Sequence, residues 1–265
     1  MPMHPAHAPR LPLLPSRARH ELSSLLELAP SSLDLMSTRS LARQGVDLLS
    51  NAANSRRFLS VLTSLQSHLR GGSVPILIKE HRDAPELMPH AELSRSQRRW
   101  IGQLALELYF TQVFRSEVAI IDLWPSRLGV DANGDAVWAP RPFYLRWDPV
   151  FREGVRNIYA GFFLENGARF ESGVHQLGLG AASHTLVAHF GEGNQRSVRF
   201  GVDKLRTTLE SMARKQTARN EQLHPNFGAF GLYLVALHEL LGSLDMTYDV
   251  RAAFMRTYPG DASKR

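Results

Sequence analysis

The sequence predicts a mainly helical fold with a small β component. From Glu21 onward, apolar residues recur at spacings of three and four, which is the period of an amphipathic helix. Only short β-prone runs interrupt this pattern, and two of them flank Asn133-Gly134, the strongest short-range signal of a β-hairpin. The 265 residues, 43% of them hydrophobic, are enough to bury an ordinary globular core.

Local capping signals place the individual helices. Residues 94–116 form the clearest helix, because Ser94 and Gln97 make a capping-box pair ahead of a wide apolar stripe. Asp148-Pro149 predicts the start of another helix, with the aspartate as N-cap and the proline in the first turn. Apolar periodicity predicts further helices at 40–70, 170–177, 203–219, 228–244 and 250–258. Short β-prone runs predict strands at 74–78, 118–121, 128–130 and 136–138.

Composition excludes several classes of chemistry. The chain has no cysteine, which rules out disulfides, thiolate zinc sites and cysteine nucleophiles. Lysine and arginine number 31 against 25 acidic residues, a mild basic excess. No apolar run reaches the roughly 18 residues of a membrane span. We therefore expect a soluble, cytoplasmic protein, either free or peripheral to a membrane.

The order of these elements resembles the C-terminal lobe of protein kinases, in which an aspartate-containing loop and a hairpin follow a long buried helix. The particular residues resemble the UbiB/AarF family of atypical kinase-like proteins, whose catalytic loop reads Q-x-F-x-x-G-x-F-H-x-D-P-H-P-G-N-L. Gln112 and Phe114 match the opening of that motif. Without a gap, Asp122 aligns with the catalytic aspartate and Pro125 with the proline before Gly-Asn.

The metal-binding residues of that motif are replaced. Arg127 stands in place of the asparagine, and Pro140-Arg141-Pro142 stands in place of the later D-F-G. Ile120 and Trp124 replace the two histidines. Because no carboxylate remains at the D-F-G position, the resemblance implies a site without magnesium.

Three further stretches support the resemblance. Residues 47–58 resemble the helix motif D-x-x-x-E-A-x-N-x-x-x-F, with Asn51 in place of the glutamate. Asp148-Pro149 resembles the segment after D-F-G, and residues 244–250 resemble a late L-D-P-x-F-D element with Met246 in place of the proline. In the right order, these motifs indicate a divergent relative of the family.

Composition and the resemblance together predict three regions. Five of the 15 prolines fall in the first 15 residues, so 1–20 is expected to be a disordered proline- and arginine-rich segment. Residues 21–92 correspond to a reduced N-lobe, and 93–265 to a helical kinase-like C-lobe. Upstream of Asp47 the chain lacks a phosphate-covering loop, and its first lysine is Lys79, after the helix motif. Lys79 therefore cannot stand for the phosphate-pairing lysine.

The candidate site residues come from this alignment. Asp122 is the only match to a catalytic residue, and its structural alternative is a loop aspartate that caps backbone amides or pairs with a nearby arginine. Arg127, Trp124 and Glu80 are the candidate ligand-binding residues. Arg127 places a fixed positive charge where the metal would sit, so it could pair with Asp122 or bind phosphate without metal. An ordinary surface arginine is the competing interpretation. We expect no metal site.

These features predict a pseudokinase resembling the UbiB/AarF family, a non-catalytic protein linked to isoprenoid or quinone lipid metabolism. We expect no cofactor, or ATP bound without magnesium. An unidentified protein is the expected partner, with an isoprenoid lipid or an anionic membrane surface as further candidates; nucleic acid is not expected. The first alternative is a divergent ATP-binding enzyme that uses Asp122 as base. The second is a basic helical module for nucleic acid or membrane, built on five basic residues: Lys204, Arg206, Arg214, Lys215 and Arg219.

Overall fold

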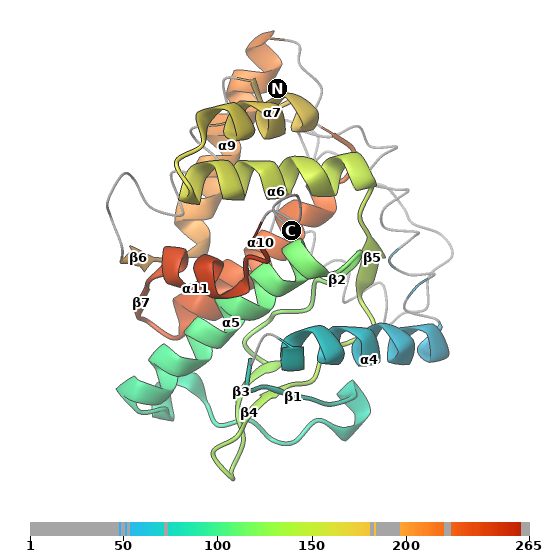
Figure 1. The fold of residues 1–265 in the computed structure, drawn as a ribbon. Helices are drawn as coiled ribbons and strands as arrows, with labels where there is room; N and C mark the ends of the chain where they lie inside the picture. The colour runs from blue at the N-terminus through green and yellow to red at the C-terminus, as the bar shows by residue number, and fades with distance from the viewer. Residues whose placement is uncertain are drawn as a thin grey trace, which may run out of the picture.

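A computed structural model describes residues 48, 51, 54–71, 74–180, 183, 197–219 and 224–260 of the chain. The described part is mainly helical with a small sheet component, as the sequence predicts. Figure 1 shows α6 and α7 on one side of the long helix α5, and α4 with β1, β3 and β4 on the other. The predicted region 1–20 lies outside the described residues.

The helices agree with the predicted ones to within a few residues, apart from the first. They are α4 (Ser55–Gly71), α5 (Arg95–Arg115), α6 (Pro149–Phe163), α7 (Gly167–Leu177), α9 (Val202–Arg219), α10 (Phe227–Ser243) and α11 (Val250–Thr257), with 3-10 turns at His81–Asp83 and His90–Glu92. The single helix predicted over 40–70 is wrong at Asn54, which is not helical. The Asn54 side chain accepts a hydrogen bond from the N–H of Arg57 at 3.1 Å and so caps a new helix, α4.

The predicted capping signals are confirmed. The Ser94 hydroxyl accepts from the N–H of Gln97 at 3.2 Å, and the Gln97 side chain accepts from the N–H of Ser94 at 2.9 Å. The Asp148 carboxylate accepts from the N–H groups of Val150 and Phe151, with Pro149 in the first turn of α6. These caps satisfy backbone donors that the helices leave open at their N-termini.

In the part of the chain that the structure describes, the strands form three small sheets. Strands β1 (Leu77–Ile78), β4 (Ala136–Trp138) and β3 (Leu128–Val130) form one sheet in that order, with β1 parallel to β4. Strand β2 (Val118–Ile120) pairs antiparallel with β5 (Tyr144–Arg146), and β6 (Val198–Arg199) with β7 (Thr247–Tyr248). The predicted hairpin is β3–β4. Its turn is held by Asp131, whose carboxylate accepts from the N–H groups of Asn133 and Asp135, and Gly134 supplies the positive φ of 86°.

The core is built around α5. Every residue from Leu104 to Phe114 is buried, and α5 contacts α4, α6, α10 and α11. Helices α6 and α7 pack at very short range, because a Cβ on Gly161 would lie 2.4 Å from the backbone nitrogen of Phe170. Among the described residues, no helix has both the length and the apolar character needed to cross a membrane.

Candidate functional site

The loop that carries Asp122 is anchored by a buried glutamine of α5. Gln112 has no exposed surface, and its side-chain oxygen accepts from the N–H of Ile120 at 2.7 Å. Its amide nitrogen donates to the carbonyl of Ile120 at 3.3 Å and to the hydroxyl of Tyr233 at 2.6 Å. Both backbone groups of the last residue of β2 are therefore tied to α5 immediately before the loop begins, which gives Gln112 a structural role.

Three buried tyrosines complete this network. The hydroxyl groups of Tyr109 and Tyr159 lie 2.5 Å apart, and the ring of Tyr109 packs at 5.0 Å from that of Tyr233. Burial raises the pKa of all three hydroxyls. They therefore remain protonated and act as hydrogen-bonding struts between α5, α6 and α10.

Asp122 is buried and fully engaged by Arg141. One carboxylate oxygen, Oδ2, accepts from the backbone N–H of Arg141 at 2.7 Å, and the other, Oδ1, accepts from Nη2 of the same residue at 2.7 Å. The Nε of Arg141 adds contacts of 3.2 and 3.3 Å to the two oxygens. The Asp122 side chain has 0% exposure and that of Arg141 16%, so the ion pair is largely shielded from water.

The surroundings hold this ion pair in one geometry. The Arg141 guanidinium lies 4.9 Å from the ring centroid of Phe143, within the range of a cation–π contact. The indole N–H of Trp138 donates to the backbone carbonyl of Asp122 at 2.9 Å. Both carboxylate oxygens of Asp122 are occupied, and this is the structural alternative considered for the residue.

Arg127 lies on the same loop but contacts a different residue. Its Nη1 donates to Nδ1 of His81 at 2.9 Å, and its backbone carbonyl accepts from the N–H of Ala139 at 2.9 Å. The arginine that pairs with Asp122 is Arg141, so the pairing considered between Arg127 and Asp122 is not the one formed. Arg127 instead ties the Asp122 loop to the 3-10 turn after β1.

The other two candidate residues lie at the edges of this region. Trp124 is half-buried and packs against the core, and its carbonyl accepts from the N–H of Arg127 at 2.8 Å. Glu80 is exposed at the start of the 3-10 turn that carries His81. Its side chain forms no hydrogen bond or ion pair with the described residues. The structure thus places Asp122 and Arg127 on one loop. Glu80 lies one residue before His81, which Arg127 of that loop contacts.

Two residues of this site were not among the predicted ones, Arg141 and His81. The sequence contained one signal for Arg141: an aspartate in a strongly apolar loop needs a cation, and pairing with a nearby arginine was the structural alternative for Asp122. His81 carried no comparable signal, because its contact with Arg127 spans 46 positions.

The residues of the site do not fit a magnesium ion. Asp122 is saturated by Arg141, and Arg127 adds a second positive charge to the loop. The described ranges contain no group of three or more histidine, aspartate or glutamate side chains placed to hold a metal. Two arginines are present where a metal site needs negative charge, so the arrangement is suited to structural ion pairing.

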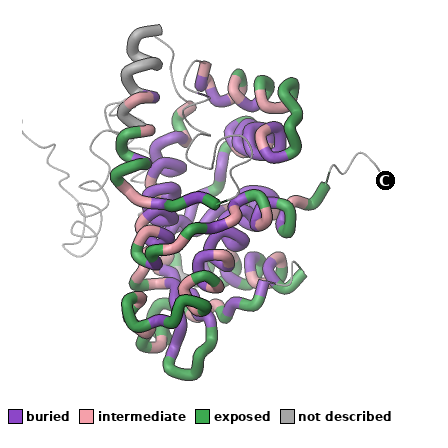
Figure 2. The backbone as a smooth tube through the Cα atoms, turned by 90° about the vertical axis from the view of Figure 1, so that its left-hand side faces the viewer, coloured by how far each residue is buried: buried purple, intermediate pink, exposed green. Residues whose placement is uncertain are grey.

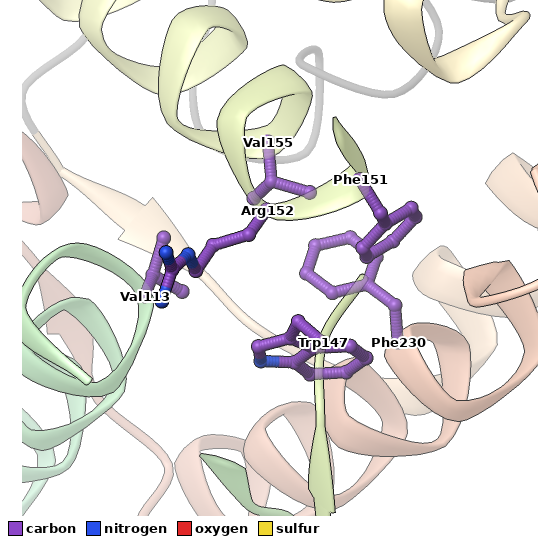
Figure 3. Close-up of a pocket in the computed structure, with 6 residues that line it drawn as sticks. All are labelled: Val113, Trp147, Phe151, Arg152, Val155 and Phe230. Carbon is purple, nitrogen blue, oxygen red and sulfur yellow. The ribbon is translucent and has the colours of Figure 1, made fainter. Parts of the chain in front are cut away.

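A small apolar cavity lies between other elements. Figure 3 shows Trp147, Phe151 and Phe230 facing one side of it and Arg152 lying toward Val113 on the other. Its volume is about 10 Å³, far below the roughly 300–1,000 Å³ typical of ligand sites. The Arg152 guanidinium reaches the carbonyl of Ser116 at 3.5 Å, near the end of α5. This cavity is a packing defect of the core.

The fold and the site together define a mainly helical protein whose aspartate-bearing loop is closed by an internal arginine. Compared with profiles of known protein families and with curated protein sequences, the chain matches none.

Proposed function

We propose that the protein is a non-catalytic relative of the UbiB/AarF kinase-like proteins and that it acts by binding. The observation that carries the proposal is the ion pair between Asp122 and Arg141, in which both carboxylate oxygens are already hydrogen-bonded. A base held in this way cannot take the proton of an incoming hydroxyl group without breaking a buried ion pair.

The order of elements supports the likeness to a kinase C-lobe. The buried helix α5 leads into β2, the Asp122 loop, the β3–β4 hairpin, β5 and then α6. Apart from β5, this is the order of elements that resembles a kinase C-lobe. The contacts of Gln112 explain why a chain could keep the first residue of the motif after losing the metal ligands, since Gln112 fixes the loop to α5.

Charge argues against phosphoryl transfer. That reaction depends on metal ions and positive groups arranged around the triphosphate, and losing one such stabiliser costs on the order of 3 kcal/mol in other enzymes. Here the metal-binding asparagine and the D-F-G aspartate are both replaced by arginine-containing sequence, at Arg127 and Arg141. The partner we propose is another protein, and the link to isoprenoid or quinone lipid metabolism follows from the resemblance.

An ATP hydrolysis assay with magnesium tests the proposal. We expect the purified chain to hydrolyse no more ATP than the Asp122→Asn variant does. The matched control is Asp135→Asn, which neutralises an exposed aspartate in the hairpin turn. Hydrolysis that disappears in Asp122→Asn and persists in Asp135→Asn would show that the chain is an enzyme.

Thermal shift with nucleotides separates the divergent-enzyme alternative. We expect ATP to leave the melting temperature unchanged with or without magnesium. A magnesium-independent increase that is lost in Arg127→Ala would instead assign Arg127 the role of the metal, and would overturn the non-catalytic proposal in favour of a nucleotide site.

A further inference from the structure

A second cavity lies far along the chain from the Asp122 loop, between the β6–β7 pair and the first turn of α9. Its volume is about 420 Å³, within the range typical of ligand sites, and it is open to solvent on one side. These elements lie together at one edge of the molecule, at the left of Figure 1, and that edge faces the viewer in Figure 2. The lining residues are Ser197, Val198, Arg199, Phe200, Gly201, Lys204 and Thr247.

The cavity has an apolar floor and a basic rim. Val198 and Phe200 are buried, whereas Arg199 and Lys204 are exposed. Hydroxyl groups of Ser197 and Thr247, both exposed, complete the lining. The chemistry offered is therefore two positive groups and two neutral donors above a hydrophobic base.

The positive charge of the rim is only partly neutralised. Arg199 forms an ion pair with Asp245, but the two side chains are 66% and 65% exposed. Such exposed pairs are weak and exchange readily with other anions. Lys204 pairs with no carboxylate of the described residues. An anionic ligand can therefore displace Asp245 from Arg199, and Lys204 can bind the same ligand.

The neighbouring end of α5 increases the positive potential. Its first five residues include Arg95, Arg98 and Arg99, and its first turn has no acidic residue. This is an unfavourable placement beside the positive end of a helix dipole, so it does not serve helix stability. The hydroxyl of Tyr248 in β7 donates to the carbonyl of Arg98 at 3.2 Å, which places this turn beside the cavity strands. Arginines in such a place attract anions toward the cavity.

We propose that this cavity binds a ligand that carries a phosphate group, held between Arg199 and Lys204. Arginine offers a planar pair of donors to phosphate oxygens, lysine offers a compact charge, and the hydroxyls of Ser197 and Thr247 can donate as well. The inference is independent of the proposed function, because the cavity shares no residue with the Asp122 loop.

The lining favours a phosphate group over a nucleic acid strand. Single-strand binding uses exposed aromatic side chains on which bases stack. The aromatic residues at this cavity, Phe200 and the adjacent Tyr248, are 5% and 2% exposed. Phe200 belongs to the floor and Tyr248 lies outside the lining, so neither ring offers a stacking surface. A phosphorylated small molecule or a phospholipid headgroup presents the group that the rim accepts.

Calorimetric titration with glycerol 3-phosphate tests the site. We expect binding that weakens by about tenfold or more in Lys204→Gln and in Arg199→Gln, as expected for loss of a charge-assisted hydrogen bond. We expect tighter binding in Asp245→Asn, since the competing carboxylate is removed. The matched control is Arg206→Gln, which removes the same charge two residues further along α9. The Arg206 side chain pairs with Asp203 at 3.4 Å and does not line the cavity.

Vesicle sedimentation distinguishes the source of the phosphate. Co-sedimentation with vesicles of phosphatidylcholine and phosphatidic acid, but not with phosphatidylcholine alone, identifies a lipid headgroup if Lys204→Gln abolishes it and Arg206→Gln does not. Binding of glycerol 3-phosphate without co-sedimentation identifies a free ligand. Equal losses in Lys204→Gln and Arg206→Gln would overturn the proposal, as would a failure to bind both glycerol 3-phosphate and the vesicles that contain phosphatidic acid. All the substituted side chains are exposed, and unchanged melting temperatures confirm that the variants fold.

Discussion

Replacing Arg141 by methionine isolates the contribution of the ion pair that closes the Asp122 loop. Methionine keeps an unbranched apolar stem but removes the guanidinium. The Asp122 carboxylate, which has no exposed surface, then retains the backbone N–H of residue 141 as its one donor among the described residues. Its negative charge remains buried without a partner.

Removing one partner of a buried ion pair costs about 3–5 kcal/mol. For a chain of this size, each kcal/mol corresponds to roughly 2–4 °C in melting temperature, so we expect a decrease of about 6–20 °C. The Arg146→Met variant is the matched control. Arg146 pairs with Glu117 at 2.8 Å, almost the same separation, but these side chains are 66% and 63% exposed. Such a pair contributes about 0–1 kcal/mol.

Thermal and urea unfolding followed by circular dichroism measure both variants. Adding Asp122→Asn to Arg141→Met removes the unpaired charge and keeps an acceptor for the N–H of residue 141, so the double variant should recover at least about half of the lost stability. The reasoning is refuted if Arg141→Met and Arg146→Met destabilise equally, or if the double variant is less stable than Arg141→Met alone.

Three further predictions concern His238, Gly161 and Asp148. Burial lowers the pKa of His238 to about 4, despite the hydrogen bond of its ring to the carbonyl of Gly201, so the folded state binds fewer protons than the unfolded state below about pH 6.5. The free energy of unfolding should therefore decrease as the pH is lowered from neutral, by about 2 kcal/mol at pH 5. Urea unfolding should show a smaller decrease in His238→Gln. Gly161→Ala should destabilise the fold by about 1–3 kcal/mol, because the added Cβ would meet the α7 backbone. Gly231→Ala should be neutral or stabilising, because its added Cβ would meet no neighbouring element within 4 Å. Melting temperatures check this: we expect a decrease for Gly161→Ala and none for Gly231→Ala. Asp148→Ala should cost about 1 kcal/mol in urea unfolding through loss of the α6 cap, and an unchanged midpoint would contradict that role.

The elements that local signals predicted agree closely with the structure. The capping box at Ser94, the Asp148 cap and the Asn133-Gly134 turn each depend on hydrogen bonds between residues at most four positions apart. Such contacts form wherever the local sequence permits them. The error at Asn54 has the same origin, because the apolar stripe of 40–70 continues through a residue whose side chain caps a new helix.

The candidate site was predicted only in part. The alignment placed Asp122 and Arg127 on one loop, which needs no tertiary information because they are five residues apart. It could not choose the cation that neutralises Asp122. Arg141 reaches it across 19 positions and the intervening β3–β4 hairpin, and His81 reaches Arg127 across 46.

The division between local sequence and tertiary structure has one physical cause. Periodicity and capping describe which face of an element is apolar and where it begins, so the mainly helical fold, its hairpin and its helix starts were all accessible from the chain itself. They carry no information on which distant side chain fills a given space. The pairing of Asp122 with Arg141 and the basic cavity of β6, β7 and α9 both depend on how distant elements pack, because only packing brings those charges together and excludes water from between them.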